Sequence, residues 1–306
     1  MSDLVEVPCN LCGRNDYKVL YKAALKKGEG GEEVSKFSAA STHVTEDQVV
    51  KCNDCGLIYI NPRLKPDSII SGYSEAVDEV YVSQAEGRMQ SFRHVVDKIG
   101  KAFGRKGRFL DVGCAAGFLL AAAKEKGWEA QGVEPSKWLG QWGSKRFGIK
   151  IDPGTLEEQN YPAKSFDVVC MFDVLEHVPD PAQTLLECKR ILKDDGMLVV
   201  NYPNIGSLWA KAAGKKWWFL LSVHLTYFTP KTIKKMLEKT GFDEVSASRY
   251  YGKLSIGYLV GRFKPYSEGF YKALNKISSA LKLNERQVSY YASQHLVLAR
   301  KAGARR

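Results

Sequence analysis

Short apolar runs alternate with longer amphipathic segments through most of the chain after residue 108. The runs are rich in Val, Ile, Leu and Phe, which is typical of buried strands, and the segments between them have the spacing of helices. Strands are expected at 108–112, 129–134, 166–172 and 197–202, with a shorter one near 149–151, and helices at 118–127, 136–148 and 181–193. This alternation predicts βαβ units with a mainly parallel sheet, and therefore a protein of the α/β class.

The last third of the chain adds one well-marked helix and two further strands. The segment TPKTIKKMLEKTG places Thr229 as an N-cap, Pro230 at the first helical position and Gly241 at the C-terminal stop. Strands are expected in DEVSASRY and SQHLVLARK, on either side of a helical insertion near 252–290. Before the sheet, residues 71–107 have helical spacing, and we expect them to form a connector that caps the following domain.

Four of the seven cysteines form two C-x-x-C pairs, CNLCG and CNDCG. Two such pairs, each followed by a glycine that permits a tight turn, are typical of a tetrahedral zinc site. We therefore expect a zinc-ribbon-like domain over residues 1–70, with structural zinc on Cys9, Cys12, Cys52 and Cys55. The alternatives are a redox dithiol or chance pairing, and the polar chain between the pairs is expected to form a loop or short hairpin. The remaining cysteines lie in apolar segments and are expected in the core: Cys114, Cys170 and Cys188.

Composition limits the classes of function. The chain has 306 residues, of which 44% are hydrophobic, so it can form one large and one small domain. Its net charge of +11 suits an anionic partner, whether nucleic acid, a nucleotide-sugar or a membrane surface. No segment approaches about 18 consecutive apolar residues, and the N-terminus does not read as a signal peptide. We therefore expect a cytoplasmic protein without a transmembrane segment.

The stretch FLDVGCAAGFLL joins an expected strand to an expected helix through a turn that contains glycine. In an open parallel sheet, such a turn lets a ligand approach the backbone at the helix N-terminus. A dinucleotide-binding turn would have glycine where this chain has Ala115 and Phe118, and the carboxylate of Asp111 would repel a phosphate. Glu134 lies about 20 residues after Gly113, where a carboxylate accepts hydrogen bonds from ribose hydroxyls. These residues favour an adenosine ligand with a positive charge and no phosphate.

The segment 109–201 resembles the class I S-adenosylmethionine-dependent methyltransferases. The resemblance rests on four motifs in the family's order and spacing: DVGCAAG, GVEPS, SFDVVCMFDVLEHVPDP and MLVVNYP. It implies a Rossmann-like seven-stranded sheet with helices on both faces over residues 108–306, after the small N-terminal zinc-binding domain. It also implies a methyltransferase that uses S-adenosylmethionine.

The resemblance implies a cofactor site at known positions of this sequence. The methionine end of S-adenosylmethionine would lie against the glycine turn, the ribose on Glu134, and the adenine beside the loop after the third strand. The residues implied are Asp111, Gly113, Cys114, Gly117, Glu134, Thr155, Leu156 and Phe172. The chain departs from the family pattern at Ala115, where glycine is usual, and at Thr155, where an acidic residue often meets the adenine amine. The second departure leaves the adenine contact open.

Two histidines and a tyrosine are candidate catalytic groups. A hydroxyl or carbon acceptor needs a general base, and the resemblance places His224 in the loop that faces the acceptor, with Tyr227 near it. The alternative is that His224 caps the following helix or packs against Trp217 and Trp218. His177, after the fourth strand, is the other candidate base. In ubiquinone-pathway O-methyltransferases the matching positions can bind a divalent cation, here Asp173, Glu176 and His177; a structural role beside the cofactor is the alternative.

The resemblance implies the acceptor only by class. The chain resembles a bacterial and archaeal group associated with glycan and secondary-metabolite pathways. The shared features are the two zinc knuckles, the segment GLIYINPRL that follows them, and the methyltransferase-like segment after it. They also resemble the N-terminal part of the deoxysugar C-methyltransferases, although this chain is shorter and lacks their extra C-terminal domain. Methyl transfer to O or C of a small molecule is implied, with a sugar or glycan-pathway intermediate as acceptor. A lipid-linked acceptor stays open because ALNKISSALKL is amphipathic.

The main alternative is an RNA-modifying methyltransferase or an RNA-binding protein. The positive charge, the zinc knuckles and the interleaved lysines and aromatic residues at 211–219 favour it. The segment DVLE after the fourth strand argues against it, because base-amine methyltransferases have an Asn/Asp-Pro-Pro-aromatic motif there. A third interpretation is a protein that binds the cofactor without catalysis.

Overall fold

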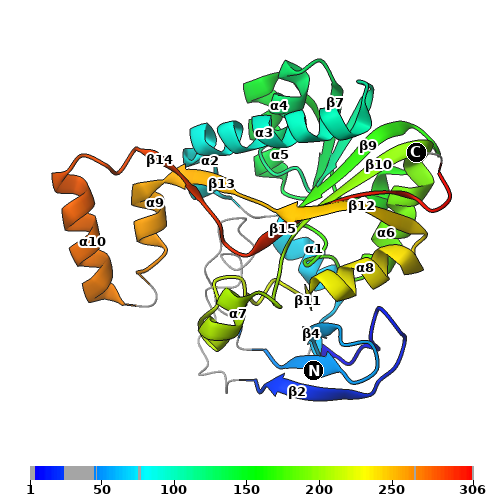
Figure 1. Ribbon diagram of the computed structural model, residues 1–306, viewed down its shortest axis with the longest axis horizontal. Coiled ribbons are helices and arrows are strands. Elements are labelled where there is room, and N and C mark those ends of the chain that lie inside the picture. Colours follow the sequence, from blue (N-terminus) through cyan, green and yellow to red (C-terminus); the bar gives the residue numbers. More distant parts are fainter. Residues whose placement is uncertain (1–3, 24–44, 46, 75–76, 265–266, 305–306) are drawn as a thin grey trace.

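The computed structural model describes residues 4–23, 45, 47–74, 77–264 and 267–304. Most of the polar chain between the cysteine pairs, expected as a loop or short hairpin, lies outside the described residues. Figure 1 shows a large sheet flanked by helices, a smaller sheet near the N-terminus, and a helical arm at the left.

Seven strands form the main sheet: β6 (Arg108–Val112), β7 (Glu129–Glu134), β8 (Lys150–Pro153), β9 (Phe166–Phe172), β10 (Leu192–Pro203), β12 (Phe242–Arg249) and β15 (Gln294–Lys301). Their order is β12-β15-β10-β9-β6-β7-β8. Strands β6 to β10 run parallel, whereas β15 is antiparallel to both β10 and β12. From β6 the chain first adds strands on one side of the sheet, β7 and β8, and then adds β9 on the other side. Open α/β sheets bind ligands at such a switch point, which here lies between β6 and β9. The predicted seven-stranded Rossmann-like sheet is confirmed.

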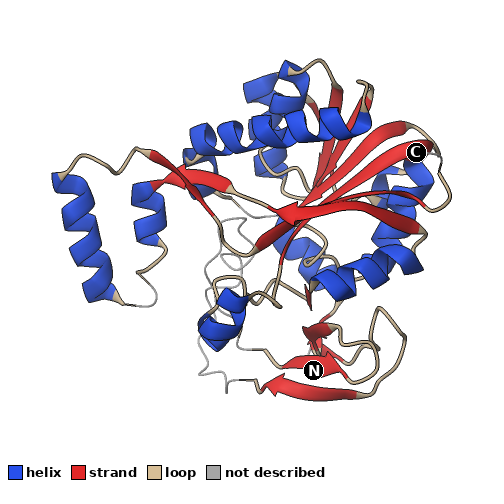
Figure 2. Ribbon diagram, viewed as in Figure 1, coloured by secondary structure: helices blue, strands red, loops and turns tan. Residues whose placement is uncertain are grey.

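Helices cover both faces of this sheet, as predicted (Figure 2). One face carries α3 (Ala85–Phe103), α4 (Phe118–Glu125) and α5 (Lys137–Phe147), and the other carries α6 (Pro181–Ile191) and α8 (Pro230–Lys239). Successive strand residues pack on opposite faces: Phe109 joins the cluster with α3 and α4, and Leu110 joins the cluster with α6 and α8. The central strands are apolar on both sides because both faces are covered.

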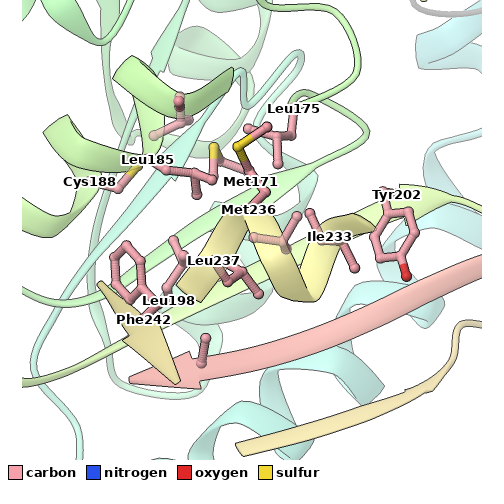
Figure 3. Packing of buried hydrophobic residues seen from close by; sticks show 14 of the residues in the cluster. Met171, Leu175, Leu185, Cys188, Leu198, Tyr202, Ile233, Met236, Leu237 and Phe242 are labelled. Carbon is pink, nitrogen blue, oxygen red and sulfur yellow. The ribbon is translucent and has the colours of Figure 1, made fainter. Parts of the chain in front are cut away.

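Helix α8 shows how the sequence defines a buried face. The Thr229 hydroxyl accepts a hydrogen bond from the backbone N–H three residues on, at 3.2 Å, and Gly241 follows the helix with a φ of +79°. Both predicted ends of this helix are therefore confirmed. Ile233, Met236 and Leu237 recur at helical spacing, and their side chains are fully buried against the sheet (Figure 3).

The smaller sheet combines the N-terminal region with a strand from the far part of the chain. It contains β2 (Tyr17–Tyr21), β3 (Val49–Cys52), β4 (Ile58–Ile60) and β11 (Thr226–Tyr227), in the order β11-β4-β3-β2. Beside it, β1 (Leu4–Val5) pairs with β5 (Arg63–Leu64). We call the described residues of 4–64 the cysteine module. Because β11 follows β10, the methyltransferase-like part of the chain completes the sheet of the cysteine module.

Helices lead from the cysteine module to the main sheet, and a helical arm leaves it. The first group is α1 (Pro66–Ser74), α2 (Glu79–Ser83) and α3. The arm consists of β13 (Gly252–Ser255), α9 (Ile256–Gly261), α10 (Glu268–Ala280) and β14 (Gln287–Tyr290), whose two strands pair antiparallel (Figure 1). The loop after β10 carries α7 (Leu208–Ala213). Within the described residues, no helix combines the length and the apolar character needed to cross a membrane.

Candidate active site

A cavity of about 580 Å³ opens at the carboxyl ends of β6, β7 and β9. Its walls come from the loops after these strands, from α1 and α3, from the loop after α7 and from the arm. The chain folds so that strand ends from distant parts of the sequence meet here, because neighbouring parallel strands end at the same edge of the sheet. The cavity therefore joins the predicted cofactor residues to the predicted acceptor residues.

The glycine turn after β6 is tight and takes a conformation that suits glycine. Gly113 has a φ of +64°, and a Cβ atom on it would lie 2.6 Å from Cγ2 of Val174. The backbone N–H groups of Gly113 and Cys114 both donate to the Val133 carbonyl, at 2.8 and 3.2 Å, which ties the turn to β7. Gly117 has a φ of +73° and begins α4, but it lies behind the residues that line the cavity.

Glu134 ends β7 with its carboxylate held in a fixed orientation. One oxygen accepts a hydrogen bond from the Ala115 N–H at 2.7 Å and the other accepts from the Ser136 N–H at 2.8 Å. Burial raises the pKa of Glu134 to about 7, although these two hydrogen bonds act in the opposite direction. Each carboxylate oxygen has a further lone pair, so both can still accept a hydrogen bond from a ligand.

Asp111 at the end of β6 is almost fully buried and faces the same cavity. Its Oδ1 atom has no hydrogen-bond partner in the part of the chain that the structure describes. Burial, and then the negative charge of Glu134, raise the pKa of Asp111 well above its usual value. A ligand with a positive group would relieve both the unpaired oxygen and the repulsion.

The structure brings most of the implied cofactor residues together. Leu156 is buried, and Thr155 precedes it at the cavity wall. The Phe172 ring meets the rings of Phe92 and Tyr250 edge-on, with centroids 5.5 and 6.0 Å away. The residues that line the cavity are Asp111, Gly113, Cys114, Glu134, Thr155, Leu156 and Phe172. Gly117 does not line the cavity; it is the N-cap of α4, at the end of the glycine turn.

Arg88 on α3 lines the cavity as well, although it was not predicted from the sequence. Its guanidinium lies 3.7 Å from the ring centroid of Tyr81, which stacks on Phe118, the first residue of α4. Its Nε atom is buried and has no hydrogen-bond partner among the described residues. A signal was present, since Arg88 lies one turn before the buried Phe92, on the apolar face of an amphipathic helix.

Glu176, His177 and His224 form a second polar group in the cavity. Their ligand atoms all lie within 4.8 Å of one another, and the two imidazole rings meet edge-on with centroids 4.5 Å apart. Neither carboxylate oxygen of Glu176 has a hydrogen-bond partner in the described residues. Burial, and then the charge of Asp173, raise the pKa of Glu176 well above its usual value.

Both histidines are neutral in this environment. His224 Nδ1 lies 2.8 Å from the Phe219 carbonyl, which can only accept, so Nδ1 carries the proton and Nε2 keeps its lone pair. Burial, and then the neighbouring His177, lower the pKa of His224 well below its usual value. Burial lowers the pKa of His177 to about 4, and its Nδ1 lies 2.6 Å from the Tyr73 hydroxyl.

Three expectations about this side of the cavity need correction. Tyr227 is buried in β11, where its hydroxyl donates to the Leu221 carbonyl at 3.0 Å, and it does not line the cavity. Asp173 accepts hydrogen bonds from Asn201 and Gln294, so the group that could hold a cation contains His224 in its place. His224 does not cap the following helix, because Thr229 does; it lies between the rings of Phe219 and His177 rather than against a tryptophan pair.

The four paired cysteines converge in the cysteine module. The Cys9 and Cys55 sulfurs are 3.4 Å apart, those of Cys12 and Cys52 are 3.5 Å apart, and all four lie within 4.8 Å of one another. Burial raises the pKa of the Cys52 thiol, but the backbone N–H groups of residues 55 and 54 outweigh it, and the net value is about 7. Amides aimed at sulfur are a feature of metal knuckles. The other three cysteines are buried, as expected.

The strand order and the glycine turn define the fold of a class I S-adenosylmethionine-dependent methyltransferase. The single antiparallel strand, β15, lies next to the edge of an otherwise parallel sheet, as it does in that fold. Residues 81–247 match the methyltransferase domain family, and this chain belongs to that family. The ubiquinone biosynthesis O-methyltransferase of Actinobacillus pleuropneumoniae is 34% identical over 121 residues, which are 36% of this chain and 51% of that protein. The chain thus spans about half the length of this curated relative.

Two solved structures show the same fold. A SAM-dependent methyltransferase from Archaeoglobus fulgidus has a TM-score of 0.51 and 20% identity, over 73% of this chain and 100% of that one. The 1,6-didemethyltoxoflavin-N1-methyltransferase of Burkholderia thailandensis, solved with its substrate and S-adenosylhomocysteine, has a TM-score of 0.50 and 15% identity, over 82% of this chain and 97% of that one. None of these three names refers to a sugar acceptor, so the sugar prediction gains no support from them.

Proposed function

We propose that this protein transfers a methyl group from S-adenosylmethionine to a small molecule. The observation that carries the proposal is a single cavity that is lined both by the glycine turn with Glu134 and by the group of Glu176, His177 and His224. A two-substrate reaction needs both sites in contact, because the reacting atoms must meet. Family membership supports the same reaction class.

Charged groups at the turn fit the amino-acid end of S-adenosylmethionine. Asp111 would accept hydrogen bonds from the ammonium group, and Arg88 would bind the carboxylate from the opposite wall. Glu134 would accept hydrogen bonds from the ribose hydroxyls, and Thr155 and Leu156 would flank the adenine. In this pose the methyl group would point toward the part of the cavity that His224 lines.

The residues around His224 fit the handling of a proton. S-adenosylmethionine, when bound, supplies a methyl group on a positively charged sulfur. His224 Nε2 would take the proton from an acceptor hydroxyl, because this nitrogen is neutral and has a lone pair. The carboxyl group of Glu176 lies within 4.8 Å and would stabilise the protonated imidazole. His177 orients the pair through its edge-on contact with the His224 ring.

The lining of the acceptor side limits the class of acceptor. Ile69, Trp218, Phe219 and Tyr258 supply an apolar and aromatic wall. Aromatic faces of this kind bind the flat apolar surfaces of phenols and also of sugar rings. Phenols are therefore candidate acceptors beside the sugar or glycan-pathway intermediates that the sequence resemblance implies, and RNA serves as the contrasting class in a screen.

We also propose that the cysteine module binds a structural zinc ion. In a tetrahedral site with Zn–S bonds of about 2.3 Å, sulfurs lie about 3.8 Å apart. The pairs at 3.4 and 3.5 Å approach this geometry. The glycines after each pair, Gly13 and Gly56, have positive φ values and donate to the carbonyls of Cys9 and Cys52, which closes each knuckle. Four protein ligands leave no open position, so the ion would not take part in catalysis.

Calorimetry on the purified protein tests the proposal. S-adenosylmethionine and S-adenosylhomocysteine are expected to bind, whereas NADH is not, and metal analysis of the same sample should find zinc. The acceptor class follows from methyl-labelled S-adenosylmethionine incubated with phenols, nucleotide-sugars and RNA. Label in a small molecule supports the proposal, and label in RNA alone would overturn the acceptor class. A protein that binds neither adenosyl compound would overturn the function itself.

A further inference from the structure

The two loops that carry the acceptor-side residues both rest on the cysteine module. One loop, 173–181, follows β9 and contains Glu176 and His177; the other, 217–227, contains His224. We propose that the cysteine module positions these three side chains, so that metal binding at the four cysteines sets the geometry of the acceptor site. The proposal rests on the proposed function for its catalytic meaning, but its structural part can be tested without turnover.

Asn10, inside the first cysteine pair, holds the first loop. Its side-chain NH₂ donates to the Asp180 carboxylate at 2.8 Å, and its side-chain oxygen accepts from the Ala182 N–H at 3.0 Å. Asp180 is the N-cap of α6 and lies three residues after His177. The Asn10 carbonyl also accepts a hydrogen bond from Lys239 on α8, at 2.7 Å. The first knuckle is therefore joined to the start of α6 and to α8.

A second contact to the same loop comes from the end of the module. The guanidinium of Arg63 on β5 donates to the Pro179 carbonyl at 2.7 Å. Burial lowers the pKa of Arg63, and the negative charge of Asp180 counteracts this. The loop is thus held at two adjacent residues, Pro179 by Arg63 and Asp180 by Asn10.

Strand β4 holds the second loop. It pairs with β11, so that Tyr59 lies opposite Thr226, and the Ile60 N–H donates to the Leu225 carbonyl at 3.0 Å. Leu225 is the neighbour of His224 in sequence. Tyr59 is buried in the same apolar cluster as Cys9 and Cys52, so the strand that fixes the second loop packs directly on the cysteines. Figure 1 shows β4 and β11 side by side below the main sheet.

The two loops also bind each other at the point where both meet the module. The backbone N–H groups of Leu225 and Thr226 donate to the Glu176 carbonyl, at 2.8 and 3.1 Å. A shift of β11 would therefore move Glu176 and His224 together. The hydrogen bonds of the turn at Gly113 run to β7 and Glu134 and to neither loop, although Val174 of the first loop packs against Gly113. Loss of the metal should disturb the acceptor side while the cofactor side keeps its shape.

The cysteine module depends on metal binding because it is small. Its strands are short, and a sheet of this size has too little core to be rigid alone. A structural zinc ion supplies folding free energy to such a module. Without the ion, four cysteines would stay close together with nothing to hold their sulfurs, and Asn10 and β4 would lose their fixed support.

Asn10→Ala provides the test, with Asn53→Ala as its matched control. Asn53 occupies the same position in the second cysteine pair, but its side chain donates to Asp16 at the surface and touches neither loop. The chain has five histidines, so the imidazole signals of His177 and His224 can be assigned by NMR on histidine-labelled protein. Zinc content and S-adenosylhomocysteine affinity are measured on the same samples.

Asn10→Ala should shift the NMR signals of His177 and His224. Once an acceptor is known, the same variant should have a kcat about 10-fold to 100-fold lower, which is the usual effect of misplaced reacting groups. Zinc content should be unchanged and S-adenosylhomocysteine affinity should stay within about twofold of wild type. Asn53→Ala should change none of these. Removal of the metal by a chelator should shift the same two histidine signals.

Two results would overturn the positioning role. One is an Asn10→Ala spectrum that matches Asn53→Ala; the other is a chelated protein whose His177 and His224 signals stay in place while its zinc is gone. Failure of the proposed function would look different. In that case wild-type protein would not bind S-adenosylhomocysteine at all, whereas the histidine signals would still report on the module.

Discussion

Replacing Arg88 with methionine should weaken the binding of S-adenosylhomocysteine and leave the binding of 5′-methylthioadenosine unchanged. The two ligands share the adenosine and the thioether, but only the first has an amino-acid group. Arg88 is a cationic side chain that lines the same cavity as the glycine turn, and it lies over the ring of Tyr81. Methionine has a similar length and keeps an apolar contact with that ring, so the change removes mainly the charge.

The size of the effect follows from the surroundings of Arg88. Its Nε atom has no hydrogen-bond partner in the described residues, so the interaction that the substitution removes is the contact of the guanidinium with the Tyr81 ring. A hydrogen bond between charged groups contributes about 1.5–3 kcal/mol. Since each 1.4 kcal/mol is a factor of ten, S-adenosylhomocysteine should bind about 10-fold to 100-fold more weakly. Loss of the contact between the charge and the Tyr81 ring, which contributes about 0.5–2 kcal/mol, should lower the melting temperature slightly.

Isothermal titration with both ligands measures this difference directly. Arg93→Met is the control on the same helix, because Arg93 is exposed and pairs with Glu125 at 2.7 Å, away from the cavity. The reasoning fails if Arg88→Met binds S-adenosylhomocysteine as tightly as wild type. It also fails if both ligands are weakened equally, because the effect would then come from a general change of the cavity rather than from a carboxylate contact.

Further predictions concern the pH dependence of cofactor binding, the glycine turn and the base. Ribose hydroxyls donate to an ionised carboxylate, and Glu134 has a pKa of about 7 in the ligand-free protein. The affinity for S-adenosylhomocysteine should therefore rise as the pH increases through that value and then level off. In a titration series at different pH values, Glu134→Gln should remove this rise. Gly113→Ala should lower the melting temperature by more than Gly104→Ala, because both positions have a positive φ but only Gly113 would place its Cβ 2.6 Å from Val174. The left-handed backbone alone costs about 1–2 kcal/mol, and overpacking adds about 1–3 kcal/mol; equal melting temperatures would contradict the clash. His224→Gln should lower kcat for methyl transfer without a change in S-adenosylhomocysteine affinity, and unchanged turnover would exclude His224 as the base.

The sequence predicted those parts of the fold that depend on local patterns. The apolar runs correspond to strands of the main sheet, and α8 begins after Thr229 and ends before Gly241 as expected. The glycine turn was also recognisable, because a positive φ at Gly113 is a property of a few consecutive residues. Residues at the ends of adjacent parallel strands meet at one edge, so Asp111 and Glu134 could be expected to share a cavity.

The remaining parts depend on contacts between distant segments. Asp173 has a φ of +54°, and its carboxylate accepts hydrogen bonds from Asn201 and Gln294. Tyr227 was expected near His224 as a catalytic group, and its ring centroid does lie 6.1 Å from that of His224. Because β11 pairs with β4, however, the side chain is buried in the interior and does not line the cavity. That pairing joins residues far apart in sequence, and a two-residue strand has no sequence pattern that would reveal it.

The unpaired groups of the cavity explain why these residues belong to a binding site rather than to the core. Among the described residues, every buried carboxylate oxygen without a hydrogen-bond partner belongs to Asp111 or Glu176, and both side chains line the cavity. A buried polar group without a partner costs about 1–3 kcal/mol, so native proteins rarely retain one without a role. Asp111 lies at the glycine turn and Glu176 lies beside His224, which places one unpaired carboxyl group at each end of the cavity. An amino-acid ammonium group would give Asp111 a partner, and a polar group of a bound acceptor would give Glu176 one, so the protein should be most stable when cofactor and acceptor are bound together.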